Sequence, residues 1–288
     1  MNTARLSRKL KILAWTATSV CVAASLVAGA KPPAPQATIT SLAGSLDAVS
    51  AGSATDAWAV GQTRTTKTLA LHWNGTSWTQ VTTPAPGAFG SLLSGVIEIS
   101  PTNVWAVGSS NTSSGSKTLA LHWNGTRWAQ ISTPNSGIST LSGVSAVSAN
   151  DIWAVGSGGT QTRETTLVLH WDGKAWTQVP SPTPGLRNGG GQLTGVSSLT
   201  GSDAWASGLF HTNGGGEGTL LLHWNGTSWT RVPSPSPSPG GPAGGSFLNG
   251  VDMVATSDVW SAGGTVFDST GNERTLLLHW NGMAWTRF

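Results

Sequence analysis

A fivefold internal repeat marked by tryptophan constrains this chain more than any other feature. The segment Ala-Trp-Ala-Val-Gly at 57–61 returns, with small changes, at 104–108, 152–156, 204–208 and 259–263. A Leu-His-Trp-Asn/Asp-Gly segment follows each copy, and another Trp stands three residues after its Gly. Fifteen of the 16 tryptophans therefore occupy three equivalent positions in five units. A repeat of roughly 40–50 residues is typical of stacked supersecondary units rather than of one irregular domain.

Each unit carries the pattern of four short strands. In the third unit, 141–148 alternates apolar and small polar residues, 152–156 is short and apolar, 166–171 is apolar and β-branched, and 176–179 follows a tight turn. Asp172-Gly173, and Asn-Gly in the other units, is a strong hairpin signal because Gly adopts positive φ without penalty. No helical periodicity is present after residue 31. The sequence predicts an all-β fold, a five-bladed β-propeller with four antiparallel strands per blade.

The propeller is expected over residues 46–288, with repeats that start near 46, 93, 141, 193 and 248. Because Phe288 aligns with the end of the fourth strand of the other units, we expect the fifth blade to pack on the first in a closed monomer. The segment Thr38-Ile39-Thr40 is a candidate to support that closure by adding to an edge. The alternative is an open fragment that needs a partner chain to complete six or more blades.

The first 45 residues do not belong to the repeat. Four positive charges within 1–11, an uncharged apolar stretch over 12–27 and Ala28-Gly29-Ala30 predict a secretory signal peptide over 1–30. A retained membrane anchor is the alternative, but 16 helical residues cover only about 24 Å of a ~30 Å bilayer core. Residues 31–45 are predicted to form a Pro-rich spacer. We therefore expect a secreted, extracellular protein without cysteine, since Cys21 is the sole cysteine.

The composition excludes several kinds of partner. Only 9% of the residues are charged, so a nucleic-acid-binding arm and an acidic tail are poorly supported. Four of the 15 basic residues lie within 1–11, which leaves 11 against 12 acidic residues after cleavage. We expect no nucleic-acid partner and, once the signal peptide is removed, no membrane association.

The repeat resembles a known class of propeller. Gly143 to Gly156, followed by Leu169 to Trp176, is similar to secreted bacterial propeller repeats of the Asp-box and photosystem II stability-factor type. That resemblance covers residues 46–288 and implies the propeller architecture. The hairpins lack the Ser-x-Asp-x-Gly-x-x-Trp spacing of an Asp-box. Sugar-binding lectins with a similar blade number are an analogy of fold only.

A histidine and an acidic or amide residue recur in every unit. The histidine precedes the third-strand Trp, and its predicted partner stands two residues before the second-strand Trp. The pairs are His72 and Asp56, His122 and Asn103, His170 and Asp151, His223 and Asp203, and His279 and Asp258. We interpret them as hydrogen-bonded pairs inside each blade, comparable to the Asp-His-Ser-Trp network of WD repeats, with Ser53 and its equivalents as the hydroxyl members. No metal-ligand spacing or phosphate-binding loop is present, so no metal or cofactor is predicted.

Variation between the units suggests where a ligand binds. The loops joining strands two and three, and those joining successive blades, differ in length and carry most of the charge, and in a propeller they share one face. The candidate binding residues there are Arg64, Arg163, Glu164, His211, Glu217, Asp268, Glu273 and Arg274. The favoured function is a non-enzymatic binding module for an extracellular glycan or a cell-surface protein. The alternative is a polysaccharide hydrolase or lyase in which Glu164, Glu217 and Glu273 supply an acid and a base within about 5–10 Å of each other.

Overall fold

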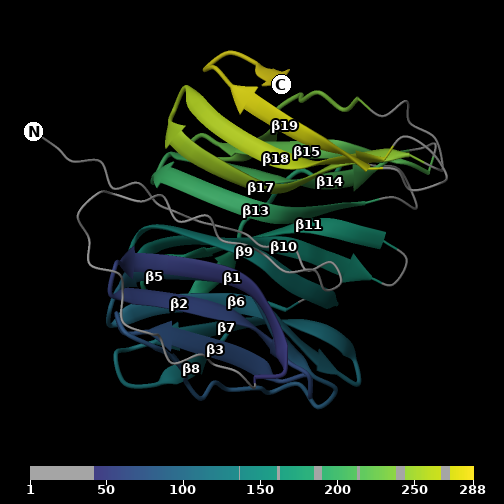
Figure 1. Cartoon of the computed structure of the whole chain (residues 1–288). Coiled ribbons are helices and arrows are strands. Elements are labelled where there is room, and N and C mark those ends of the chain that lie inside the picture. Colours follow the sequence, from purple (N-terminus) through teal and green to yellow (C-terminus); the bar gives the residue numbers. More distant parts are fainter. Residues whose placement is uncertain are drawn as a thin grey trace, which may run out of the picture.

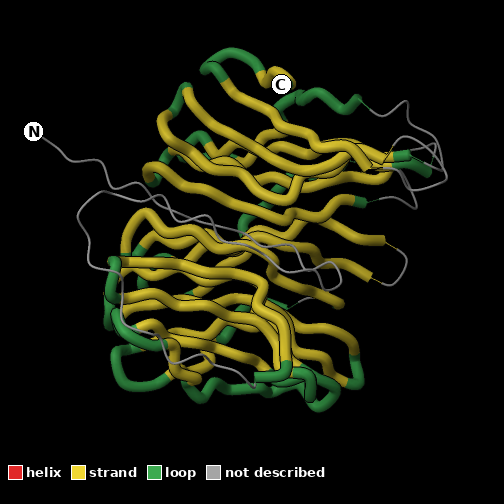
Figure 2. Tube along the Cα trace, in the orientation of Figure 1, coloured by secondary structure: helices red, strands yellow, loops and turns green. Residues whose placement is uncertain are grey.

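The computed structural model describes residues 42–135, 137–160, 163–184, 190–212, 215–237, 244–266 and 273–288. The predicted signal peptide, residues 31–41 of the predicted spacer and Asp268 lie outside these residues. The described chain consists of strands, turns and loops (Figure 2), and none of its elements is a helix able to span a bilayer.

The described residues form twenty strands in five successive four-stranded antiparallel units, which confirms the predicted five-bladed propeller (Figure 1). Blade 1 comprises β1 (Gly44–Ser53), β2 (Asp56–Thr63), β3 (Thr68–Trp73) and β4 (Trp78–Gln80). Blade 2 comprises β5 (Ser91–Ser100), β6 (Asn103–Thr112), β7 (Gly115–Trp123) and β8 (Trp128–Ile131). Blade 3 comprises β9 (Ile138–Ser148), β10 (Asp151–Thr160), β11 (Arg163–Trp171) and β12 (Trp176–Gln178).

Blade 4 comprises β13 (Gly191–Thr200), β14 (Asp203–His211), β15 (Glu217–Trp224) and β16 (Trp229–Arg231). Blade 5 comprises β17 (Gly245–Ala255), β18 (Asp258–Val266), β19 (Glu273–Trp280) and β20 (Trp285–Arg287). A single parallel pairing of Glu217 with Gly245 joins blades 4 and 5 into one eight-stranded sheet. The second strand of every blade ends, and the third begins, on one side of the propeller, which we call the loop face (right in Figure 1).

Glycines occupy two positions where a side chain does not fit. Gly75 has φ of 90° in the turn between β3 and β4, where Asn74 Oδ1 accepts hydrogen bonds from the backbone N–H groups of Thr76 and Ser77. Gly156, the last residue of the Trp-Ala-Val-Gly motif, packs so closely on the carbonyl of Thr140 in β9 that a Cβ would clash with it. The motif glycine therefore permits the close contact of the first two strands of a blade.

A tryptophan cluster joins each of the first four blades to the next. The second-strand Trp153 of blade 3 lies 4.9 Å from Trp224 and 5.2 Å from Trp229 of blade 4, measured between ring centroids. Equivalent clusters are centred on Trp58, Trp105 and Trp205. All four central rings are at most 2% exposed. Because each ring removes ~150–250 Å² from water, these clusters are the main apolar contacts between blades.

The fifth blade does not repeat this cluster with the first. Within the described residues, the only aromatic rings that the Trp260 ring contacts are those of His279 and Phe288, both of its own blade. Leu277 is 40% exposed, whereas its four equivalents, Ala70, Ala120, Val168 and Leu221, are fully buried. A cavity of about 390 Å³ is lined by the first strands of all five blades, and Trp260, Ala262 and Leu277 of blade 5 also face it. The expected closure by direct packing of blade 5 on blade 1 is therefore not matched by the contacts that join the other blades.

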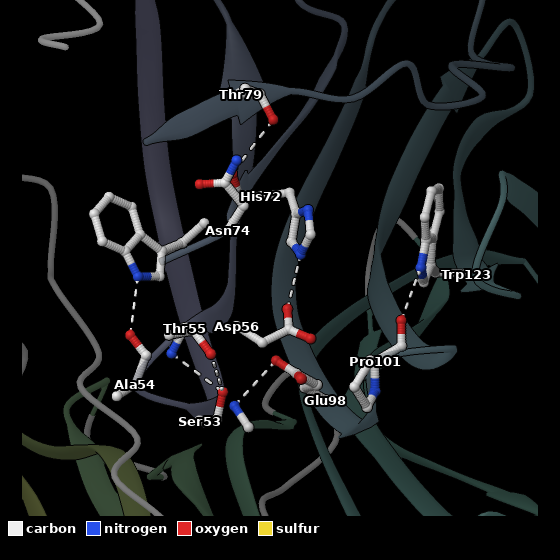
Figure 3. Close-up of polar contacts among 12 residues, drawn as sticks. Ser53, Ala54, Thr55, Asp56, His72, Asn74, Thr79, Glu98, Pro101 and Trp123 are labelled. Carbon is white, nitrogen blue, oxygen red and sulfur yellow. Dashed lines mark hydrogen bonds and ion pairs between the residues drawn. The ribbon is translucent and has the colours of Figure 1, made fainter. Parts of the chain in front are cut away.

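The predicted histidine pairs form in all five blades. Histidine Nε2 lies 2.7–2.9 Å from the carboxylate or amide oxygen of its partner. Each ring also packs on the second-strand Trp, for example at 4.4 Å between the centroids of His72 and Trp58. Figure 3 shows His72 pointing at Asp56. The structural interpretation is correct for the His–Asp contact.

The expected hydroxyl member is not part of these pairs. Ser53 Oγ instead accepts a hydrogen bond from the backbone N–H of Thr55, in the turn between β1 and β2 (Figure 3). Ser148 and Thr200 do the same with Asn150 and Ser202. A hydroxyl three residues before the Asp is close enough to bond the turn backbone, and that local contact is formed in place of the longer one.

Candidate functional site

A pocket of about 310 Å³ opens on the loop face between blades 3 and 4. Its walls are polar strand ends from β9, β10, β11 and β14, together with Gly190 of the connection before β13. Three of the predicted binding residues, Arg163, Glu164 and His211, line it. This is the candidate functional site.

Strand geometry brings the pocket residues together. His211 donates its backbone N–H to the carbonyl of Gly190 at 2.8 Å. On the other side, Gly190 lies directly against the backbone of Glu164, so that a Cβ at this position would clash with the Glu164 carbonyl. A residue without a side chain thus connects the end of β14 to the start of β11 and holds the two side chains near each other.

Glu164 and His211 form a loose contact at the centre of the pocket. The distance from His211 Nε2 to Glu164 Oε2 is 3.9 Å, and the two side chains are 39% and 36% exposed. Glu217 pairs directly with His211 across β14 and β15, so their side chains lie on the same face of the sheet about 5 Å apart at Cβ. Glu217 is not part of the pocket lining, so Glu164 is the acidic group of the pocket, with the exposed Arg163 beside it.

The other predicted residues lie outside this pocket. Arg64 is exposed at the end of blade 1, where its backbone N–H donates to Ala43. Glu273 and Arg274 begin β19 and are exposed. Asp268 is outside the described residues. The eight candidates are therefore spread over blades 1, 3, 4 and 5, and only those of blades 3 and 4 converge.

Six of these candidates begin or end strands, although the sequence placed them in loops. Arg163 and Glu164 start β11, Glu217 starts β15, and Glu273 and Arg274 start β19; His211 likewise ends β14. The hairpins at the loop face are longer than expected. In blade 3, for example, Gly158 and Gly159 pair with Thr165 and Glu164, so the pairing of β10 with β11 continues beyond their apolar residues. Strand ends hold side chains more rigidly than loops do, which favours a preformed site.

The strand register also gives the spacing between Glu217 and Glu273, two of the glutamates considered as an acid and a base. From Glu217 the sheet runs through Gly245 and Val266 to Glu273, each paired with the next. Three strand spacings separate the two glutamates by about 14 Å between Cα atoms. The two glutamates are therefore not cross-strand neighbours, in contrast to the directly paired Glu217 and His211.

The neutral part of the pocket was not singled out in the sequence. Thr140 and Ser157 line it and contact each other, with 3.3 Å between their hydroxyl oxygens. Thr160 and Ile138 complete the described wall. These positions vary in character among the five repeats, and that variation is the signal which points to them. Within the described residues, no group of His, Cys, Asp and Glu is arranged to hold a metal ion.

Comparisons with solved structures support the propeller fold. An ulvan lyase of polysaccharide lyase family PL25, bound to -[GlcA(1-4)Rha3S]-, matches with 11% identity and a TM-score of 0.54 over 82% of this chain and 69% of the other. The six-bladed fucose-binding lectin of Aleuria aurantia matches with 12% identity and a TM-score of 0.52 over 80% and 72%. YCF48 bound to a D1 peptide matches with 13% identity and a TM-score of 0.48 over 91% and 88%.

No protein-family model matches the sequence, and no curated protein does either. The chain is a β-propeller. At 11–12% identity the lyase and the lectin share its fold alone. The finer resemblance to Asp-box and photosystem II stability-factor repeats stays a sequence-based prediction.

Proposed function

We propose that this propeller is a non-enzymatic binding module that holds an extracellular glycan in the loop-face pocket between blades 3 and 4. The observation that carries the proposal is the convergence of Arg163, Glu164 and His211 on one cavity of about 310 Å³. That volume is at the lower end of small-ligand sites and suits one or two sugar rings. Charged donors and acceptors beside the Thr140 and Ser157 hydroxyls offer both partners that a sugar hydroxyl needs.

Structural neighbours add a weaker argument. The propellers with the same fold include a fucose-binding lectin and a lyase bound to a sulfated polysaccharide. Their ligands are carbohydrates, and propeller fold alone does not fix function. The pocket of this chain must therefore be tested on its own residues.

Binding is favoured over catalysis because Glu164 is the single acidic residue in the described lining of the pocket. The register places Glu217 and Glu273 about 14 Å apart at Cα, and Glu164 faces an imidazole rather than a second acid. A protein ligand is the second candidate from the sequence. The pocket favours a glycan because most of its described lining is polar, with Ile138 as the single large aliphatic side chain.

A glycan array with the purified chain tests the proposal directly. We expect selective binding that weakens about tenfold or more in Arg163→Ala and Glu164→Gln, since each loses a charge-assisted hydrogen bond. The matched control is Arg127→Ala, an exposed arginine in a hairpin between β7 and β8 on the opposite side of the propeller. Silence across all sugars, or binding unchanged by both pocket variants, would refute the proposed site.

Turnover of a bound sugar would refute the non-enzymatic part of the proposal. Mass analysis of the array ligands after incubation detects it, and Glu217→Gln tests whether the loop glutamates are responsible.

Secretion is part of the same proposal, because an extracellular glycan requires an extracellular protein. The predicted signal peptide over residues 1–30 supports it. Mass spectrometry of culture supernatant is expected to find a chain that begins near Lys31. Recovery only from membranes, with the N-terminus intact, would contradict it.

A further inference from the structure

The loop-face ends of the strands in blades 1 and 2 carry basic residues but no acidic ones. The acidic residues of these two blades are Asp47, Asp56 and Glu98. Asp47 lies within β1, and the other two lie near strand ends on the opposite side of the propeller. The turn between β2 and β3, residues 63–67, presents the exposed Arg64 and Lys67 (lower part of Figure 1). We call this turn the basic hairpin.

An exposed phenylalanine stands beside the basic hairpin. Phe89 lies in the connection between β4 and β5 and is 68% exposed. Its neighbour Gly90 packs on the hairpin, since a Cβ at this position would lie 3.1 Å from that of Thr66. Ser91 donates its backbone N–H to the Thr66 carbonyl at 2.8 Å. The connection that carries the aromatic ring is therefore fixed to the turn that carries the two cations.

The backbone around the phenylalanine is held on both sides. Phe89 donates its N–H to the carbonyl of Asn111 at 3.0 Å, and Asn111 donates its own to Gly90 at 2.8 Å. Thr66 has a φ of 59° and is the one non-glycine residue with positive φ in the described part of the chain. That conformation is costly for a β-branched residue, and such strain is concentrated at ligand sites. A ring presented on so constrained a backbone loses little entropy when it binds.

This surface is the counterpart of the pocket between blades 3 and 4. Thr66 and Glu164 occupy the same position in the repeat, as do Asn111 and His211. The pocket thus has a carboxylate and an imidazole where this surface has a hydroxyl and an amide. Asn111 Oδ1 accepts a hydrogen bond from Ser116 Oγ at 2.7 Å, which leaves the amide N–H groups as donors. The same frame here lacks the negative charge of the pocket.

We propose that an anionic sugar of an acidic polysaccharide binds on this surface, stacked on Phe89, with its carboxylate or sulfate held by Arg64 and Lys67. An aromatic ring covers the apolar face of a sugar ring, and cations bind such anions through charge-assisted hydrogen bonds. The Asn111 amide and the Thr66 hydroxyl supply partners for sugar hydroxyls. The site shares no residue with the described lining of the pocket, and it rests on the proposed function for the class of ligand alone.

Calorimetric titration of the purified chain is the first test. The probes are an oligogalacturonate, which carries carboxylates, dextran sulfate and neutral dextran. We expect at least one anionic probe to bind at ~0.05 M salt and to bind about tenfold more weakly at ~0.5 M, since exposed charges are screened. The anionic probe that binds distinguishes carboxylate from sulfate recognition. Equal binding of neutral dextran, or no binding of either anionic probe, would overturn the proposal.

Variants assign the binding to this surface. Phe89→Ala, and Arg64→Gln combined with Lys67→Gln, should each weaken binding about tenfold or more, whereas Phe89→Trp should retain it. The matched control is Phe288→Ala, which removes a 71% exposed ring after the last strand of blade 5. Affinity that is unchanged in Phe89→Ala would overturn the site.

The pocket variants separate this site from the proposed function. Arg163→Ala and Glu164→Gln should leave the affinity for the anionic probe unchanged. If these two variants abolish its binding and Phe89→Ala does not, the second site is wrong while the pocket stands. A loss confined to the Phe89 and Arg64 variants supports the second site even where the glycan array refutes the pocket.

Acetylation of the unaltered chain gives a measurement that does not depend on the folding of a variant. The bound anionic probe should protect Lys67 but not Lys174, an exposed lysine in the turn between β11 and β12. Equal modification of Lys67 with and without the probe would contradict the proposal. Because exposed rings and cations also bind single-stranded nucleic acids, tighter binding of oligothymidylate, lost in Phe89→Ala, would overturn the assignment to a sugar.

Discussion

The four interfaces between successive blades pack differently from the facing surfaces of blades 5 and 1, which we call the seam. Both are built from the same repeat. Trp58, Trp105, Trp153 and Trp205 are buried between two tryptophans of the following blade. Trp260 occupies the same position in the sequence but is half-buried, and its Nε1 donates to Asp258 at 3.0 Å. The comparison shows that the repeat specifies the contacts between one blade and the next along the chain. It does not by itself specify the same contacts between the last blade and the first.

Removing the central tryptophan of an interface should produce the largest effect. Trp153→Ala deletes a fully enclosed ring and leaves a cavity, so we expect the free energy of unfolding to fall by about 3–5 kcal/mol. Trp260→Ala in the seam should cost about 1–2 kcal/mol, because part of its surface is already solvated. Chemical denaturation of both variants measures the difference. Equal losses would mean that the seam is packed as tightly as the other interfaces.

The interface between blades 1 and 2 differs from the others in containing a buried carboxyl group. Glu98 of β5 accepts a hydrogen bond from the backbone N–H of Gly52 in β1 at 3.0 Å, and Asp56 lies close to it (Figure 3). Burial, followed by the charge of Asp56, raises the pKa of Glu98 to about 7. Its other oxygen, Oε1, is buried and has no hydrogen-bond partner among the described residues.

This carboxyl group should make the interface between blades 1 and 2 sensitive to pH. Since the folded-state pKa is higher than the unfolded value of 4.5, the folded state binds more protons between pH 4.5 and 7. Stability should therefore fall as the pH rises through this window, by about 2 kcal/mol after partial solvent screening, and level off above it. Glu98→Gln should keep the Gly52 contact and remove the slope. A wild-type unfolding free energy that is constant from pH 4.5 to 7 would contradict this assignment.

The histidine pairs test the same contrast between the inner blades and the last blade, with smaller expected losses of stability. Asp203 in blade 4 has a side chain that is 10% exposed, whereas that of Asp258 in blade 5 is 41% exposed. His223→Ala leaves a buried carboxylate without its partner and should cost about 1–3 kcal/mol. His279→Ala should cost about 0.5 kcal/mol, because its partner carboxylate is already largely solvated. Thermal denaturation of the two variants compares them, and the reverse order would show that exposure does not control their contribution.

These contrasts also show how far the sequence alone can lead. Five copies of one motif were enough to predict five blades, and the His170–Asp151 contact followed from the need to pair polar groups on a buried strand. The looser packing at the seam was not predictable. Leu221 and Leu277 occupy the same position in the repeat, but Leu221 is buried against the next blade and Leu277, in the last blade, is exposed.

Within the candidate site, charge led the sequence analysis to Arg163, Glu164 and His211. It did not reveal that these three residues meet. Their contact depends on Gly190, which lies between two strand ends that are 47 residues apart in the chain. Glu273 carries the same kind of charge on the same face, but it lies in blade 5 and does not line the pocket.

The smallest expected effect concerns a hydrogen bond that crosses between inner strands. Ser145 Oγ of β9 accepts from the backbone N–H of Ser198 in β13 at 3.1 Å, and Ser50 and Ser197 make the same contact with Glu98 and Met253. In blade 2 the equivalent residue is Ile97, which has no hydroxyl group.

Replacing this serine should weaken one interface without disturbing the tryptophan cluster. Ser145→Ala removes a bond between partly buried groups and should lower the free energy of unfolding by about 1 kcal/mol. Ser148→Ala is the matched control, because its hydroxyl bonds only the exposed turn before Asp151, and it should change stability by about 0.5 kcal/mol or less. A double-mutant cycle with Ser198→Ala isolates the contact between the two hydroxyls, whose oxygens lie 2.9 Å apart. If Ser145→Ala proves as neutral as its control, the hydrogen bond does not contribute to holding the blades together, and the apolar clusters alone account for the strength of the four interfaces.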